Sequence, residues 1–302
     1  MRYDYRVSLS VSILAHNKPG PLRKLLNSKA INNFDIVNIF IDPVPDESGK
    51  WIATSMIENI CLEAKKANAR IKIHKHDSHL GLYRAVRKAL DITFELSDFA
   101  TIFEEDCIPS PLVIDYIKTL ISNPKIELED CHVALSRHVP SARKLNISHS
   151  KYPFVWGWAS SKKVWSNSKV EAKEYDLSVL QTKLWSVPGA TKEFVDHWLH
   201  IANLAKSSGP GKIENNWIKN SWATPFTIGY WLKNKNQYSL RPPINLVKNI
   251  GFGTNATHTF RKPAHAKRVP FFPRSLPDLN YLQIDEFNLL ENKLVYDIRG
   301  AI

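Results

Sequence analysis

Apolar and polar residues form regular blocks along the first third of the chain, and the blocks alternate between two periods. Short runs rich in β-branched residues predict four buried strands, at 7–16, 34–43, 70–77 and 99–103. Between these runs, apolar residues recur every three or four positions. This period predicts a loop followed by a helix within 19–31, and helices at 55–67 and 82–96. Repeated alternation of strand and helix is typical of βαβ units, which build a mostly parallel sheet covered by helices on both faces.

Each predicted strand ends in polar residues. The ends carry His16, Asn17 and Lys18, then Asp42, then 77–81, and finally the acidic triplet at 104–106. Open parallel sheets bind ligands outside the carboxyl ends of their strands, where such residues would converge. We therefore expect a binding site at this edge of the sheet.

The triplet in "FEEDCIPSP" (103–111) is the most charged of these ends. Strand alternation would place Glu104 and Asp106 on one face and Glu105 on the other. Like charges gathered at a strand end require a proton, a cation or a ligand rich in donors. The alternative is a solvated acidic turn before two prolines.

The second half, from about residue 131, has short apolar runs, many Trp and Pro residues, and no clear βαβ rhythm. The sequence has no internal repeat, and no linker separates this half from the first. We interpret it as a continuation of one large domain.

Composition narrows the class of protein. The chain has 302 residues, of which 43% are hydrophobic, enough for a sizeable core. We find no apolar run of membrane-spanning length and no signal-peptide cleavage pattern at the start. Cys61, Cys107 and Cys131 are odd in number and lack metal-site spacing, which favours a reducing compartment. These features predict a cytoplasmic protein.

The net charge of +12 is unevenly distributed. Residues 131–170 hold seven Lys and Arg and no acid, and residues 215–277 hold ten and no acid, so the remainder sums to 12 − 17 = −5. Such asymmetry favours an anionic partner. Basic and aromatic residues alternate through 217–272, a mixture that suits a nucleic acid or an anionic cell-envelope glycan, with a plain solvated basic surface as the alternative.

Three segments carry a family resemblance. The "EED" triplet with "IPSP" behind it resembles the metal-binding Asp-x-Asp region of GT-A glycosyltransferases, in the Glu-Asp-Asp form of Golgi N-acetylglucosaminyltransferases. "YPFVWGWASSKKVW" (152–165) and "PPINLVKNIGFGTNATHT" (242–259) resemble a bacterial and phage group of these enzymes. The resemblance covers about 7–260. It implies a GT-A, Rossmann-like α/β fold in one domain, with a nucleotide-sugar half (1–130), an acceptor half (131–260) and a basic C-terminal extension (261–302).

The resemblance also implies roles at the acidic triplet. Asp106 would bind Mn²⁺ or Mg²⁺ that bridges the donor diphosphate, while Glu104 and Glu105 would face the donor sugar and ribose. His258 would lie near the metal or diphosphate, with a histidine that is merely hydrogen-bonded in a loop as the alternative.

The nucleotide would lie at the other strand ends. His16 and Asn17 would lie beside it, and Asp42 would accept a hydrogen bond from its base. Gly81 would let the backbone approach the donor, and Arg84 would be available to a phosphate or sugar hydroxyl.

Trp156 and Trp158 flank Gly157, and strand geometry predicts that both point to one face. The resemblance places this stretch beside the donor sugar and the acceptor, where flat rings stack on sugars. The alternative is core packing, since most of the nine Trp residues must be buried.

The sequence departs from the family at the catalytic base. An inverting transfer needs a carboxylate to take the acceptor proton, but Asn220 occupies the corresponding place in "WIKNSWATPF". Glu214 is the nearest acid, and Asp196 on a predicted helix is a weaker candidate. Assisted proton removal by another route, or a catalytically silent protein, stays open.

Together these features predict a metal-dependent hexosyl- or pentosyltransferase, inverting in outcome, that uses a UDP-sugar. The expected acceptor is an anionic envelope glycan such as lipopolysaccharide or capsule, and the alternative is phage-type modification of DNA carrying hydroxymethylated bases. A non-catalytic sugar-nucleotide or DNA-binding module is a further alternative. A nucleotidyltransferase is disfavoured, because 15–25 lacks a Gly-rich activating loop with Arg and Lys.

Overall fold

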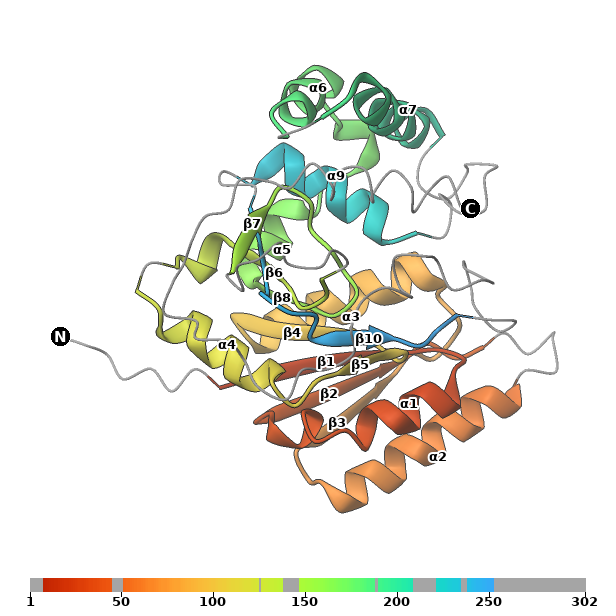
Figure 1. Ribbon diagram of the computed structural model, residues 1–302. Helices are drawn as coiled ribbons and strands as arrows, with labels where there is room; N and C mark the ends of the chain where they lie inside the picture. The colour runs from red at the N-terminus through yellow and green to blue at the C-terminus, as the bar shows by residue number, and fades with distance from the viewer. Residues whose placement is uncertain are drawn as a thin grey trace.

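The computed structural model describes seven stretches of the chain (Figure 1): 8–44, 51–124, 126–137, 147–187, 190–208, 221–234 and 238–252. Glu214, Asn220, His258 and the predicted C-terminal extension lie outside the described residues.

The described residues form one eight-stranded sheet in the order β3-β2-β1-β4-β8-β6-β9-β7. The first four strands pair in parallel and follow the predicted ranges: β1 (Ser10–Ala15), β2 (Ile36–Ile41), β3 (Ile71–Lys75) and β4 (Phe99–Glu104). This mixed, mostly parallel sheet flanked by helices confirms the predicted GT-A, Rossmann-like fold class.

The same sheet continues into the second half of the chain through strands of three or four residues: β6 (His132–Ala134), β7 (Ser148–Ser150), β8 (Trp158–Ser161) and β9 (Ser239–Arg241). β8 joins β4 antiparallel, and β6 pairs with β9 in parallel. A separate two-stranded ribbon of β5 (Cys107–Pro109) and β10 (Val247–Asn249) lies at the end of β4.

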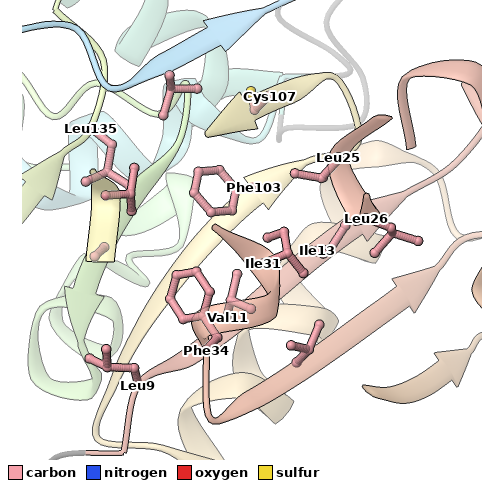
Figure 2. Close-up of a cluster of buried hydrophobic side chains, with 14 of the residues drawn as sticks. Leu9, Val11, Ile13, Leu25, Leu26, Ile31, Phe34, Phe103, Cys107 and Leu135 are labelled. Carbon is pink, nitrogen blue, oxygen red and sulfur yellow. The ribbon is translucent and has the colours of Figure 1, made fainter. Parts of the chain in front are cut away.

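Helices cover both faces of the sheet. α1 (Pro19–Leu26), α2 (Trp51–Ala67) and α4 (Val113–Ser122) pack on one face, over a cluster that includes Val11, Ile13 and Phe103 (Figure 2). α3 (Leu82–Leu96), α5 (Lys162–Ser168) and α9 (Ala223–Lys233) cover the opposite face through Leu14, Phe40 and Ile102. Side chains of β1 therefore point to both faces of the sheet, so that Val11 and Ile13 pack in one core and Leu14 packs in the other.

A third layer lies beyond α9. α6 (Leu177–Trp185) and α7 (Lys192–Ser208) form this layer (Figure 1). They pack around Trp198 and Trp231. Short 3₁₀ turns occupy Ile31–Asn33, Leu128–Asp130 and Ala172–Glu174. Among the helices that the structure describes, none is both long enough and apolar enough to cross a bilayer.

The start of α1 differs from the predicted loop. The helix begins at Pro19 itself, directly after the strand-end residues, because proline is preorganised for the first helical position and needs no N–H partner there. Lys18 is consequently the N-cap of α1 and the last of the three residues between β1 and α1.

Candidate functional site

A cavity of about 320 Å³ opens at the carboxyl ends of the parallel strands. Residues from all four predicted strand ends line it. Of the residues that the sequence analysis singled out, it brings together His16, Asn17, Asp42, Gly81, Glu104, Glu105, Asp106 and Trp156. Convergence of these ends follows from the parallel topology, because β1, β2, β3 and β4 all finish at the same edge of the sheet.

The acidic triplet lines this cavity, with Glu105 and Asp106 buried and Glu104 half-buried. Glu105 is 7% exposed and Asp106 4%, which contradicts the alternative of a solvated turn. All three carboxylates line the cavity, whereas strand alternation predicted two faces. The reason is that β4 ends at Glu104, so Glu105 and Asp106 follow a turn rather than a pleat.

Burial changes the protonation of two of these acids. Loss of water, followed by the charge of Asp106, raises the pKa of Glu104 to about 7 and that of Glu105 to about 8. Trp222, at the start of α9, donates its indole N–H to Glu104 Oε1 at 3.1 Å, which favours the charged form.

The ammonium of Lys18 lies within the acidic cluster. Lys18 Nζ lies 2.5 Å from Asp106 Oδ2, and the two side chains are only 13% and 5% exposed. Burial alone would lower the pKa of Lys18, but the charges of Asp106, Glu105 and Glu104 raise it. Gly251, just after β10, covers this ion pair so closely that an added Cβ would overlap Asp106 Oδ2 and lie 3.0 Å from Lys18 Nζ.

Asp42 organises the opposite side of the cavity. Its Oδ1 accepts the backbone N–H of Leu80 at 2.8 Å, and its Oδ2 lies 3.0 Å from His79 Nδ1. His16 Nδ1 lies 2.9 Å from the carbonyl oxygen of Asp42, and the rings of His16 and His79 stack with centroids 5.3 Å apart. The ligand atoms of His16, Asp42 and His79 lie within 4.8 Å of one another, a set that could also hold a metal ion.

An apolar wall completes the cavity between the acidic cluster and Asp42. It consists of Phe40 from β2 and small or branched residues of α3, including Ala85, Val86 and Ala89. Gly81, the N-cap of α3, also lines the cavity. The cavity is thus lined by the acidic cluster, by the polar residues around Asp42 and by apolar side chains.

Several predicted residues lie elsewhere. Arg84 is exposed on α3 and belongs to a shallow outer groove with Arg87, Lys88 and Asp91. Asp196 is exposed on α7, where it pairs with Lys192 at 2.5 Å, and it does not line the cavity.

The two tryptophans separate, which differs from the prediction that they share a face. Trp156 lines the cavity and contacts Phe252 edge-on, with ring centroids 5.8 Å apart. Trp158 is 1% exposed and stacks on His132 and Trp222 inside the second core. β8 begins only at Trp158, and Gly157 before it has φ of 68°, so the alternation of a regular strand does not extend back to Trp156.

Sequence reasoning missed the roles of Lys18 and His79. Both lie within strand ends that the sequence marks as polar, so their position near the site was predictable. Their partners were not, because Lys18 and Asp106 are 88 residues apart in the chain.

The chemistry of the cluster fits a divalent metal ion. Glu104, Glu105 and Asp106 offer carboxylate oxygens, which hard cations such as Mg²⁺ and Mn²⁺ prefer. Among the residues that the structure describes, these three acids face the ammonium of Lys18, and together they hold more potential negative charge than that one group can balance.

Comparisons with known proteins bear on the fold. No family model matches the chain, and no curated protein matches it. Among solved structures, TarS 1-349 of S. aureus is similar with 12% identity and a TM-score of 0.37, over 54% of this chain and 50% of that one, so this chain spans half the length of that structure.

Two further structures are similar. The mannosyltransferase PcManGT from Pyrobaculum calidifontis, solved with GDP-Man and Mn²⁺, has 10% identity and a TM-score of 0.42, over 75% of this chain and 74% of that one. A cytidylyltransferase from Leptospira borgpetersenii has 13% identity and a TM-score of 0.31, over 54% and 63%. At these identities and TM-scores the likenesses do not show a function for this chain.

Proposed function

We propose that this protein is a metal-dependent glycosyltransferase that moves a sugar from a nucleotide-diphosphate sugar to a hydroxyl group of an acceptor. The observation that carries the proposal is a cavity lined both by Asp42 and by the acidic cluster with Asp106. A sugar nucleotide has the matching sequence of parts: a flat base, a ribose, a diphosphate that needs a cation, and a sugar.

The base is proposed to bind at Asp42. The Asp42 carboxylate accepts hydrogen bonds, and its orientation is held by Leu80 N–H, so a base with a ring N–H such as uracil suits it. The apolar wall with Ala85, Val86 and Ala89 leaves room for a planar ring. His16 and Asn17 lie beside this position, and UDP-sugars are therefore the proposed donors.

The diphosphate is proposed to lie between Lys18 and the acidic cluster. Asp106, with Glu104 and Glu105, would hold Mn²⁺ or Mg²⁺, and His258 is proposed as an additional ligand from outside the described residues. When bound, the ion supplies Lewis-acid stabilisation of the leaving diphosphate. Trp156, on the cavity wall, is proposed to stack on the transferred sugar or the acceptor.

Proton removal from the acceptor is assigned to Glu214. Asp196, the weaker candidate, points into solvent on α7 and is neutralised by Lys192, which leaves Glu214 as the proposed base of an inverting transfer. Arg84 is exposed, lines the outer groove on α3 and does not line the cavity, so we propose no donor contact for it.

The acceptor is proposed to be an anionic envelope glycan, such as lipopolysaccharide or capsule. The basic second half supports an anionic acceptor in general, and its mixture of basic and aromatic residues supports DNA with hydroxymethylated bases as the second candidate. Part of the basic charge is used internally, since Lys163 pairs with Asp130 at 2.9 Å and Lys169 with Asp91 at 2.7 Å. The basic residues that support an anionic acceptor are therefore mainly those of 215–277.

A ligand screen tests the proposal. We expect UDP-sugars, rather than GDP- or CMP-sugars, to raise the melting temperature of the full chain, and Mn²⁺ to enlarge the shift, because a ligand that binds only the folded state stabilises it. Asp42→Asn should weaken the nucleotide shift with and without Mn²⁺, whereas Asp106→Asn should abolish only the Mn²⁺ enhancement.

Glu95→Gln, an exposed position on the outer side of α3, serves as the matched control and should behave like the wild type. No shift with any sugar nucleotide would refute the proposal. A full Mn²⁺ enhancement in Asp106→Asn would refute the metal site.

A further inference from the structure

Lys18 holds an atom that a metal ion would need. Its ammonium lies 2.5 Å from Asp106 Oδ2, and both partners are almost completely buried. The backbone of Lys18 is held from both sides, because β1 ends at Ala15 and α1 starts at Pro19.

The surroundings leave Asp106 little freedom to bind both cations. Gly251 packs against the same Oδ2 that Lys18 contacts, without room for a Cβ, and the backbone oxygen of Asp106 accepts the N–H of Ile250 at 2.9 Å. Its second carboxylate oxygen lies 3.7 Å from Cys107 Sγ, inside the protein. A divalent ion on this carboxylate would therefore lie beside the Lys18 ammonium.

Two positive charges at that separation repel each other strongly in a partly dehydrated site. The repulsion is relieved only if the ammonium leaves. Lysine is suited to leaving, since its four-carbon stem lets the charge move while the backbone stays in place.

We propose that Lys18 is the internal cation of the acidic cluster, and that a divalent metal ion binds at Asp106 by displacing the Lys18 ammonium. The inference rests on the proposed function for the metal site. In the metal-free protein the ion pair keeps the cluster balanced. In the metal-loaded protein the released ammonium is free to contact an anionic group of the donor, such as its diphosphate.

Metal titration of the full chain without nucleotide tests the proposal. Free Mn²⁺ is measured by electron paramagnetic resonance for the wild type, Lys18→Met and Lys24→Met. Lys24 is exposed on α1 and does not line the cavity, so its variant removes the same charge outside the site. We expect Lys18→Met to bind Mn²⁺ at least about tenfold more tightly than the wild type, and Lys24→Met to match the wild type.

Loss of the ion pair should also lower the melting temperature of metal-free Lys18→Met, because Asp106 loses its partner, and Mn²⁺ should restore it. Equal or weaker Mn²⁺ binding by Lys18→Met overturns the inference and leaves the transferase proposal standing. Absence of Mn²⁺ binding in every variant also overturns it, and a UDP-dependent rise in melting temperature then shows whether the nucleotide site survives.

A second measurement covers the case in which Lys18→Met does not fold. Amine acetylation of the wild type, read by mass spectrometry, should modify Lys18 slowly without metal and severalfold faster at saturating Mg²⁺, with Lys24 as the internal reference. An unchanged Lys18 rate at saturating Mg²⁺ overturns the inference.

Discussion

At the scale of single residues, the geometry of the site depends on tight packing around the Lys18–Asp106 ion pair. Gly251 is the clearest case, because its backbone lies against the Lys18–Asp106 ion pair. Any side chain there would push Asp106 away from Lys18 or displace the segment after β10. The absence of a side chain at Gly251 thus allows Lys18 and Asp106 to form their ion pair.

Gly251→Ala is expected to lower the free energy of unfolding by roughly 1–3 kcal/mol, the usual cost of overpacking. The variant should also lose most of the stabilisation by UDP-sugar and Mn²⁺. Urea unfolding and thermal shift measure the two effects. Gly20→Ala is the control, since a Cβ at Gly20 in α1 meets nothing within 4 Å, and it should be neutral or slightly stabilising. Wild-type ligand binding by Gly251→Ala would contradict this account.

The residue types at the site were predictable, but their pairings were not. Polar strand ends in the sequence marked His16, Asp42 and the acidic triplet, because parallel strands bring such ends together. The pairing of Lys18 with Asp106 depends on the turn after β4, and no periodic pattern encodes it. Trp156 and Trp158 show the same limit, since the alternation rule fails where a strand begins between them.

At the scale of elements, the second half of the sheet is tied together by a buried polar contact. His132 on β6 lies 2.7 Å from Ser239 Oγ on β9, and its ring stacks on Trp158 of β8. Burial, and next the charge of Arg241, lower the pKa of His132 from 6.5 to about 3. The folded protein therefore keeps this imidazole neutral where the unfolded chain would protonate it.

This difference predicts acid sensitivity. Between pH 6.5 and about 3 the unfolded state binds a proton at His132 that the folded state refuses, so the free energy of unfolding falls as the pH falls through this window. The contribution of His132 is on the order of 3–5 kcal/mol by pH 3. Urea unfolding at several pH values should show a shallower decline for His132→Gln, although that variant is less stable at pH 8. An identical slope would contradict the assignment.

Element length explains which parts of the fold were predictable. β1, β2, β3 and β4 are five or six residues long, and helices with a clear period separate them. β6, β7 and β9 have only three residues each, too few for a period of two to emerge. Moreover, β6 pairs with β9, which lies 107 positions away at His132 and Ser239, and tertiary packing rather than local pattern selects that partner.

At the scale of the whole molecule, acidic and basic residues are concentrated in different parts of the sequence, and folding brings some of them together as ion pairs. Two acids of the first half pair with lysines of the second half: Asp91 with Lys169, and Asp130 with Lys163. In one further pair the base, Arg87, belongs to the first half and the acid, Glu171, to the second. These pairs are partly exposed and stabilise the fold little. The net charge of +12 nevertheless remains.

This net charge predicts salt-sensitive binding to polyanions. We expect the full chain to be retained on heparin at about 50 mM salt and to lose most of its affinity by about 200 mM, because binding releases counterions. The same titration with plain duplex DNA distinguishes the acceptor classes: a steep salt dependence supports the DNA alternative, and no binding at low salt contradicts it. Heparin retention that does not depend on salt would contradict the electrostatic account.

The hydrogen bond from Trp222 to Glu104 has a practical consequence. An indole in contact with a carboxylate changes its emission when the charge on that carboxylate changes, and Trp156 adds a second fluorophore at the cavity wall. The fluorescence of these two tryptophans should therefore respond when a ligand binds at the carboxyl ends of the parallel strands. Occupancy by ions and nucleotides can be followed by intrinsic fluorescence without a label, and Trp222→Phe and Trp156→Phe would tell the two signals apart.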